Sequence, residues 1–170
     1  LGARLGCDVV APEFESAAHA LLRQTSKTSP PAPDSTGPAR PAATRRFQAA
    51  RALVVSALAE VIEEILLQSP LLTSDAALVR GRRSLQSYAA AALLMPYDQF
   101  RETAIACRYD IDMLQYRFSA SVEQVCHRLA SLRKPGAEGV PFAFMRSDPA
   151  GYITKRLPLR DLPLPRYGGA

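Results

Sequence analysis

The sequence contains no tryptophan and only two histidines among its 170 residues, His19 and His127. It has no HExxH or CxxC motif, and no glycine-rich loop opens a helix. His127 follows Cys126 directly, but neighbouring side chains on a helix point about 100° apart, which argues against a catalytic thiol–imidazole pair. We therefore expect neither a catalytic residue nor a metal site.

Cysteine is also scarce. The three residues Cys7, Cys107 and Cys126 are odd in number, and their spacing matches neither a zinc finger nor a dense disulfide framework. Reduced, buried thiols of a cytoplasmic protein are the simplest interpretation.

Long hydrophobic runs are missing as well. The longest one, residues 89–95 with its flanks, is much shorter than the roughly 20 residues that a membrane-spanning helix requires, and no signal peptide is visible. We therefore expect a cytoplasmic protein with no membrane partner. Because the chain begins with Leu1 rather than Met and ends without a stop-like tail, we also expect a piece of a longer protein.

The sequence does contain enough apolar material for a packed domain, since hydrophobic residues make up 48% of it. Its formal net charge is +5. A basic chain favours an anionic partner, which could be nucleic acid, a phosphate-bearing ligand or the acidic face of another protein.

The predicted organisation begins with a helical segment at residues 1–24, in which Pro12 opens a helix. Residues 25–44 are rich in proline and hold no large apolar residue, so they are predicted to form a linker or long loop. Residues 45–170 are predicted to form the core domain, truncated at its C-terminal end.

Helical periodicity dominates the first part of this core. Thr44 is predicted to cap a long helix that runs to about Leu67. A second helix is expected from Ser74 to Met95, with Gly81 as a weak point inside it. Because residues 88–95 are apolar on every side, they should lie at the centre of the fold.

Shorter elements follow. Asp98 is predicted to cap a helix, and residues 113–132 should form two short helices across a tight turn, with Ser121 and Gln124 as a capping box. The alternation of Val140, Phe142 and Phe144, followed by a turn at 148–151, predicts a β-hairpin. The predicted fold class is therefore α+β and predominantly helical, with a C-terminal β-hairpin.

The predicted helix pair at 113–132 has two interpretations. It could be a helix-turn-helix that reads DNA, with Gln124, His127 and Arg128 on its exposed side as nucleic-acid contacts. Arg133 and Lys134 are further candidates for contacts with bases or phosphates. Closing a small helical core is the favoured interpretation, because Glu123 is badly placed for a phosphate backbone.

Arginines gather in both long predicted helices. Arg45 and Arg46 lie in the first turn of the first helix, and Arg80, Arg82 and Arg83 form a basic cluster before the apolar run of the second. Such charge usually marks a solvated face. The alternative is a ligand site in which these arginines bind phosphate, while Tyr88 and Tyr97 offer aromatic surface to a ring or a pantetheine arm.

The block YAAAALLMPYDQF and the helices after it resemble the ImmA/IrrE family, where the corresponding segment follows a zinc-peptidase helix. In this sequence Arg51 and Val55 stand where the two zinc-binding histidines would be, and Ala52 replaces the glutamate base. Residues 82–88 contain no carboxylate for the third ligand. The resemblance therefore implies an ImmA/IrrE-like helical core without zinc. A zinc peptidase with an atypical ligand set is the alternative.

A narrower resemblance covers residues 43–170. It rests on RRFQxA, YAAAALLMPYDQF, RYDIDMLQYRFSASVEQVCHRL, RKPGAEGVPFAFMRSDPAGYITKR and RYGGA, which are similar to the short-chain fatty-acyl transcriptional regulators of propionate, methylcitrate and acetate metabolism. The resemblance implies a sensor core that binds acyl-CoA without catalysis and acts on DNA through a domain outside this chain. Such a core could also be a homo-oligomer.

Some members of that family hold an iron–sulfur cluster through cysteines. Cys107 and Cys126 are the candidates that the resemblance offers here. Since a cluster usually needs four thiolates, we do not expect one without further cysteines.

Overall fold

The computed structural model describes residues 41–70 and 72–157 of the chain. The predicted helix at 12–24, residues 25–40 of the predicted linker and the tail after residue 157 lie outside the described residues. The elements are the helices α2 (Ala42–Ala57), α3 (Ala59–Gln68), α4 (Asp75–Leu94), α5 (Tyr97–Ala106), α6 (Ile111–Phe118) and α7 (Val122–Ala130) and the strands β1 (Phe144–Ser147) and β2 (Ile153–Leu157). The predicted fold class, predominantly helical α+β, is confirmed.

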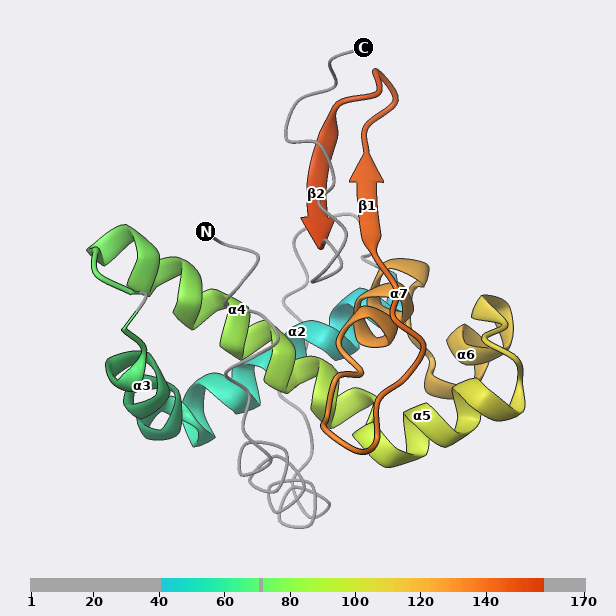
Figure 1. Ribbon diagram of the computed structural model, residues 1–170, viewed down its shortest axis with the longest axis horizontal. Coiled ribbons are helices and arrows are strands. Elements are labelled where there is room, and N and C mark those ends of the chain that lie inside the picture. Colours follow the sequence, from blue (N-terminus) through green and yellow to red (C-terminus); the bar gives the residue numbers. More distant parts are fainter. Residues whose placement is uncertain (1–40, 71, 158–170) are drawn as a thin grey trace.

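The first core cluster lies between α2, α3 and α4. The first two of these helices contribute residues spaced by four, which is one face of a helix: Ala50, Val54, Leu58, Ile62 and Leu66 are all buried. Leu85, Ala89 and Leu93 of α4 meet this face. As a result α2 and α4 pack against each other and cross obliquely, with α2 running towards α3 and α4 running towards α5 (Figure 1).

The prediction of a single helix from Thr44 to Leu67 is wrong, because the helix starts two residues earlier and is interrupted in its middle. The first turn begins at Ala42 after Pro41, without a side-chain cap, so residues 42–44 of the predicted linker are helical. The helix is then interrupted at Leu58, whose φ of −117° and ψ of 16° leave the helical region. Because Leu58 stays buried while the backbone bends, α3 continues the same apolar stripe in a new direction.

Gly81 is the point where α4 comes closest to the chain around α3. A Cβ at this position would lie 2.9 Å from Leu66 Cδ2 and 3.2 Å from Leu72 Cδ1. The absence of a side chain at Gly81 therefore permits a close contact of α4 with Leu66 and Leu72, although glycine has a low helix propensity.

The end of α4 joins the two core clusters, as predicted for the apolar run at 88–95. Ala89, Ala90 and Leu93 belong to the first cluster, whereas Met95 belongs to the second. The next helix begins at Tyr97 with Pro96 at its N-cap, so the prediction that Asp98 caps α5 is wrong. Asp98 lies in the first turn, where its charge complements the helix dipole.

The two short helices α6 and α7 are confirmed, and they close the second cluster. Ser121 Oγ accepts from the backbone N–H of Gln124, and Gln124 Oε1 accepts from the N–H of Ser121, which completes the capping box. Ser119 ends α6 in the left-handed region, with φ of 48°. Leu114 and Phe118 of α6 and Val125 and Leu129 of α7 share this cluster with Phe100, whose ring centroid is 5.1 Å from that of Phe118.

A β-hairpin is also confirmed, but it starts later than predicted. The strands β1 and β2 pair antiparallel, with a bulge between Arg146 and Ser147. Val140 and Phe142 lie in the loop before β1. Val140 is 44% exposed, and Phe142 packs against Tyr109. The hairpin projects from the helical body close to α7 (Figure 1).

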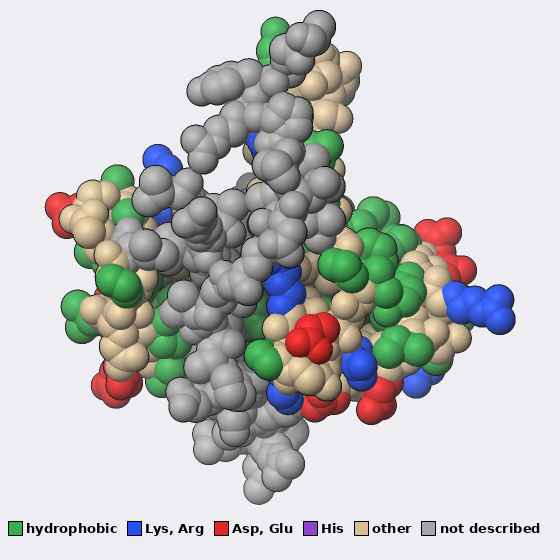
Figure 2. All heavy atoms as spheres, viewed as in Figure 1, with side chains coloured by type: hydrophobic (Ala, Val, Ile, Leu, Met, Phe, Trp, Pro, Cys, Tyr) green, Lys and Arg blue, Asp and Glu red, His purple; other side chains and the backbone are tan. Residues whose placement is uncertain are grey.

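The described surface mixes charge of both signs with apolar side chains. Figure 2 shows Lys and Arg interspersed with Asp and Glu, and hydrophobic side chains gathered over α6 and the start of α7. Met113, Tyr116 and Val122 are among the exposed ones. Separately, none of the helices in the described ranges combines the length and the hydropathy that a bilayer span requires.

Candidate functional site

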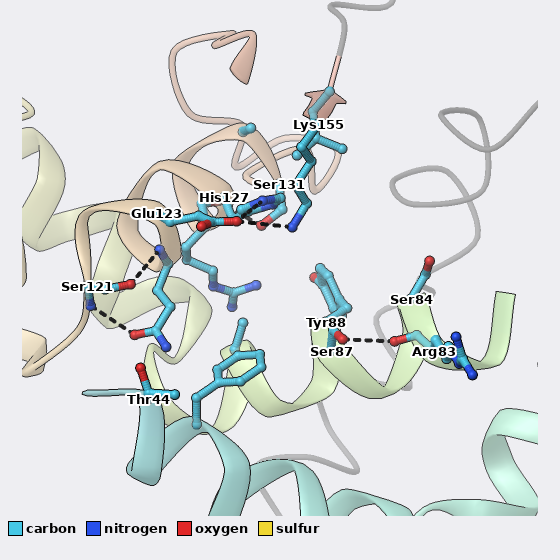
Figure 3. Close-up of a pocket in the computed structure, with 16 residues that line it drawn as sticks. Thr44, Arg83, Ser84, Ser87, Tyr88, Ser121, Glu123, His127, Ser131 and Lys155 are labelled. Carbon is cyan, nitrogen blue, oxygen red and sulfur yellow. Dashed lines mark hydrogen bonds and ion pairs between the residues drawn. The ribbon is translucent and has the colours of Figure 1, made fainter. Parts of the chain in front are cut away.

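A cavity of about 530 Å³ lies between α2, α4, α7 and β2. Figure 3 shows the side chains of α7 on one side of it, those of α4 on the other and Lys155 reaching in from the hairpin. It is lined by Thr44, Phe47, Arg83, Ser84, Ser87, Tyr88, Ala91, Ser121, Glu123, Gln124, His127, Arg128, Ala130, Ser131, Lys155 and Leu157. A cavity of this size falls in the range of small-molecule sites.

One face of α4 supplies a polar and aromatic wall. The residues that line the cavity from this helix are spaced by one, three or four positions, so their side chains point the same way: Arg83, Ser84, Ser87, Tyr88 and Ala91. Ser87 Oγ donates to the carbonyl of Arg83, one turn earlier, at 2.8 Å. The wall thus changes from a cation and hydroxyls to an aromatic ring and a methyl group.

Arg128 places a positive charge in the opposite wall. Its side chain is only 1% exposed, and Nε donates to the carbonyl of Met95 at 2.9 Å. The guanidinium carbon lies 5.4 Å from the ring centroid of Tyr88 and 5.5 Å from that of Tyr97. Cation–π contact with two rings offsets part of the cost of burying this charge.

Glu123 of α7 connects the helical body to the hairpin. Arg146 Nη1 of β1 donates to both carboxylate oxygens, at 3.0 and 3.1 Å, and Lys155 Nζ of β2 donates to Oε1 at 3.3 Å. Burial opposes ionisation of Glu123, but the hydrogen bonds from Arg146 and Lys155 outweigh it and hold its pKa below the usual value. Glu123 is therefore a carboxylate at neutral pH.

His127 lies one turn further along α7. Its ring centroid is 4.6 Å from that of Phe144, and its Nε2 is buried 3.8 Å from Glu123 Oε1. Among residues 41–70 and 72–157 this nitrogen has no hydrogen-bond partner. Burial, together with the nearby charge of Lys155, lowers the pKa of His127 to about 4. The imidazole is therefore neutral at pH 7, and its Nε2 is a polar atom of the cavity wall.

The predicted ligand residues are brought together only in part. Arg83 and Tyr88 line the cavity. Arg82 instead points to α3, where Nη2 donates to Glu63 Oε2 at 2.8 Å and Nε donates to Oε1, so this arginine serves the packing of two helices.

The other predicted ligand residues lie away from the cavity lining. Arg46 Nη1 donates to the carbonyls of Phe118 and Ser119, at 3.0 and 3.1 Å, and so caps the end of α6. Tyr97 is 2% exposed, and its hydroxyl accepts from the N–H of Lys134 and donates to the carbonyl of Ala137. Arg45 is exposed in the first turn of α2.

The prediction that Gln124, His127 and Arg128 lie on an exposed side of α7 is wrong. Arg128 is buried, because its aliphatic stem and guanidinium fill the space beside Tyr88 and Tyr97. Gln124 is occupied by the capping box, and Nε2 donates to the carbonyl of Ala43. His127 faces the cavity and the hairpin. A recognition helix needs exposed donors, so the geometry favours the packing interpretation of α6 and α7.

Several lining residues were not predicted. Lys155 and Leu157 come from the hairpin, far from α4 in the sequence, and no local pattern relates them to it. Ser84 and Ser87 could have been found, because they share one helical face with Tyr88 and Arg83.

The residues at the zinc positions of the peptidase family do not fit zinc. Arg51 Nη2 donates to Gln86 Oε1 at 3.3 Å, and the side chains of Ala52 and Val55 are exposed. A guanidinium and two aliphatic groups offer no metal ligand. Within residues 41–70 and 72–157, no group of three or more His, Cys, Asp or Glu side chains could hold a metal ion.

The described cysteines, Cys107 and Cys126, are free thiols. Burial raises the pKa of Cys126, which keeps this thiol protonated and unreactive at neutral pH. Cys107 Sγ is within hydrogen-bonding reach of the carbonyls of Ala104 and Asp110.

Comparison with protein families divides the chain at residue 131. Residues 4–130 match the IrrE N-terminal-like domain, and residues 131–170 match the C-terminal region of the short-chain fatty acyl coenzyme A regulators. The boundary falls inside the cavity, whose lining continues from α7 to Ser131, Lys155 and Leu157.

Curated proteins give the same relationship. The chain is 40% identical over 126 residues to the HTH-type transcriptional regulator PrpR of Mycobacterium tuberculosis, covering 74% of this chain and 26% of that protein. It is 41% identical over 129 residues to a propionyl-CoA carboxylase regulator of Cereibacter sphaeroides, covering 76% of this chain and 28% of the relative. The chain thus spans about a quarter of the length of these relatives.

A solved structure titled Mycobacterium tuberculosis transcriptional regulator has a TM-score of 0.77 and 28% identity, and the match covers 90% of this chain and 56% of that one. Both resemblances noted in the sequence are therefore confirmed: the chain belongs to the IrrE N-terminal-like domain family and continues into the C-terminal region of the short-chain fatty acyl-CoA regulators.

Proposed function

We propose that this chain is the ligand-sensing part of a transcriptional regulator of short-chain fatty acid metabolism, and that its cavity binds a short-chain acyl-CoA. DNA would be bound by a domain outside this chain, in the cytoplasm. The names of the relatives support the regulatory role. The observation that carries the proposal is the cavity itself, which brings cations, hydroxyls and an aromatic ring together in one lining.

The chemistry of the lining suits each part of such a ligand. Arg83 and Lys155 carry charge for phosphate groups, and the guanidinium of Arg83 can form a fork on phosphate oxygens. Ser84 and Ser87 present hydroxyls that suit the amides of a pantetheine arm. Tyr88 offers an apolar surface to a short acyl chain.

The cavity suits binding better than catalysis. The serine nearest to His127 in the chain that lines the cavity is Ser131, and its Oγ donates to the carbonyl of Arg128 rather than to the imidazole. A sensor does not need a nucleophile, because a ligand shifts a conformational equilibrium solely through different affinities for two states. Stoichiometric zinc in the purified protein, measured by elemental analysis, would favour the peptidase alternative.

Calorimetric titration of the purified full-length regulator with propionyl-CoA tests the proposal. Arg83→Ala should weaken binding about tenfold, because it removes a charge-assisted hydrogen bond. Arg80→Ala is the matched control, since Arg80 is an exposed arginine of the same helix outside the lining. Equal affinities for the two variants would exclude this cavity, and no binding at millimolar ligand would exclude the function.

A further inference from the structure

Glu123 has two cationic partners, Arg146 and Lys155, and Arg146 alone donates to both of its oxygens. Arg146 donates to both of its oxygens, at 3.0 and 3.1 Å, whereas Lys155 reaches only Oε1, at the longer distance of 3.3 Å. Both lysine and arginine donate to the same Oε1 atom. Lys155 is therefore the partner that Glu123 can lose while its charge remains paired.

Lys155 is also placed to change partner. Its side chain is 43% exposed and extends from β2 into the cavity, on the side opposite to Tyr88 and Ser84 of α4 (Figure 3). An ion pair between partly exposed groups contributes little to stability, so its loss costs little. The lysine has a flexible stem with rotatable bonds, which allows the ammonium to move without unfolding β2.

His127 does not replace Lys155 at the carboxylate. Burial of the ring, with a smaller effect from the charges of Lys155 and Arg146, lowers the pKa of His127 to about 4. The imidazole therefore carries no charge at pH 7, and the charged groups that meet at this wall are Glu123, Arg146 and Lys155.

We propose that Lys155 is an exchangeable phosphate-binding residue, which Glu123 holds while the cavity is empty and which turns to a phosphate group of the ligand, opposite Arg83, on binding. Glu123 is then an internal competitor that sets the affinity of the site. This inference rests on the proposed function and names the phosphate-bearing end of the ligand as its target. Because Lys155 lies on the hairpin and Arg83 on α4, one phosphate-bearing group would join the two family-defined parts of the chain.

A double-mutant cycle measured by calorimetric titration of the full-length regulator with propionyl-CoA tests this exchange. Lys155→Gln should weaken binding about tenfold, and Glu123→Gln should strengthen it by roughly threefold or more, because the competitor is lost. In the double variant the gain from Glu123→Gln should disappear. Lys134→Gln, an exposed lysine outside the cavity lining, makes the same charge change and should bind like the wild type.

Two further measurements separate exchange from a structural role. Lys155→Arg keeps the charge and should restore most of the affinity that Lys155→Gln loses. Propionyl-pantetheine has the same thioester but no phosphate, so Lys155→Gln should leave its affinity unchanged. Weaker binding by Glu123→Gln, or an equal loss for both ligands, would overturn the inference.

The outcomes also separate this inference from the proposed function. If the wild-type protein does not bind propionyl-CoA at all, the proposed function itself fails. If binding depends on Arg83 but Lys155→Gln has no effect, the cavity remains the site and only the exchange of Lys155 is excluded.

Discussion

The surroundings of His127 in the folded protein disfavour its protonated form. Its ring packs against Phe144 of the hairpin, and its Nε2 has no hydrogen-bond partner within the part of the chain that the structure describes. Burial and the charge of Lys155 lower its pKa to about 4, from 6.5 in an exposed histidine. Protonation is thus more favourable in the unfolded chain than in the folded protein.

This difference predicts a pH dependence of stability. Between pH 6.5 and about 4 the unfolded state takes up a proton that the folded state refuses, so the free energy of unfolding should fall as the pH falls, by at most about 1.4 kcal/mol per pH unit from this residue. His127→Gln should remove this part of the slope. Urea unfolding at several pH values measures it, and an unchanged slope in the variant would contradict the lowered pKa.

The type of a residue indicates which chemical groups it can offer, but it does not indicate where in the fold its side chain lies. Arg83 and Tyr88, predicted as ligand residues from the guanidinium fork and the aromatic ring, both line the cavity, and their role in binding stays a prediction. Arg128 was expected at the surface, since arginine is seldom fully buried. Its burial depends on rings from α4 and α5, which no pattern within α7 can reveal.

At the scale of elements, sequence patterns predict helix ends reliably where side chains close in the sequence form the hydrogen bonds to the backbone groups. The capping box of α7 needs only Ser121 and Gln124, which are three residues apart, and it is present as predicted. The break at Leu58 has no such signal, because neither proline nor glycine lies there. After the bend α3 packs against α4, so the contacts that accompany the bend are distant in the sequence.

The capping box gives a prediction at this scale. Ser121→Ala should lower the free energy of unfolding by about 1 kcal/mol, because the N–H of Gln124 loses its acceptor. The matched control is Ser56→Ala, an exposed serine whose hydroxyl donates to the carbonyl of Leu53 within α2. Denaturant unfolding of both variants measures the effect, and equal stability would show that the cap contributes nothing.

At the scale of the whole molecule, two regions that match different family models pack against each other. The helical body, up to residue 130, belongs to the IrrE N-terminal-like domain, whereas the hairpin lies in the region of the acyl-CoA regulators. The described hairpin meets α7 through Glu123, Arg146, Lys155 and the pair of His127 with Phe144. A two-stranded hairpin is marginally stable alone, so its order depends on these contacts.

A ligand that joins α4 to β2 should therefore order the hairpin more than the rest of the molecule. With saturating propionyl-CoA, amide hydrogen exchange in β1 and β2 should slow by roughly tenfold or more, because local opening of the hairpin now requires loss of the ligand. Amides of α3, which does not line the cavity, should change only by the global stabilisation. Lys155→Gln should abolish the extra protection of the hairpin while binding persists at higher ligand concentration. Uniform protection of hairpin and α3 would instead mean that the ligand stabilises the fold without coupling its two regions.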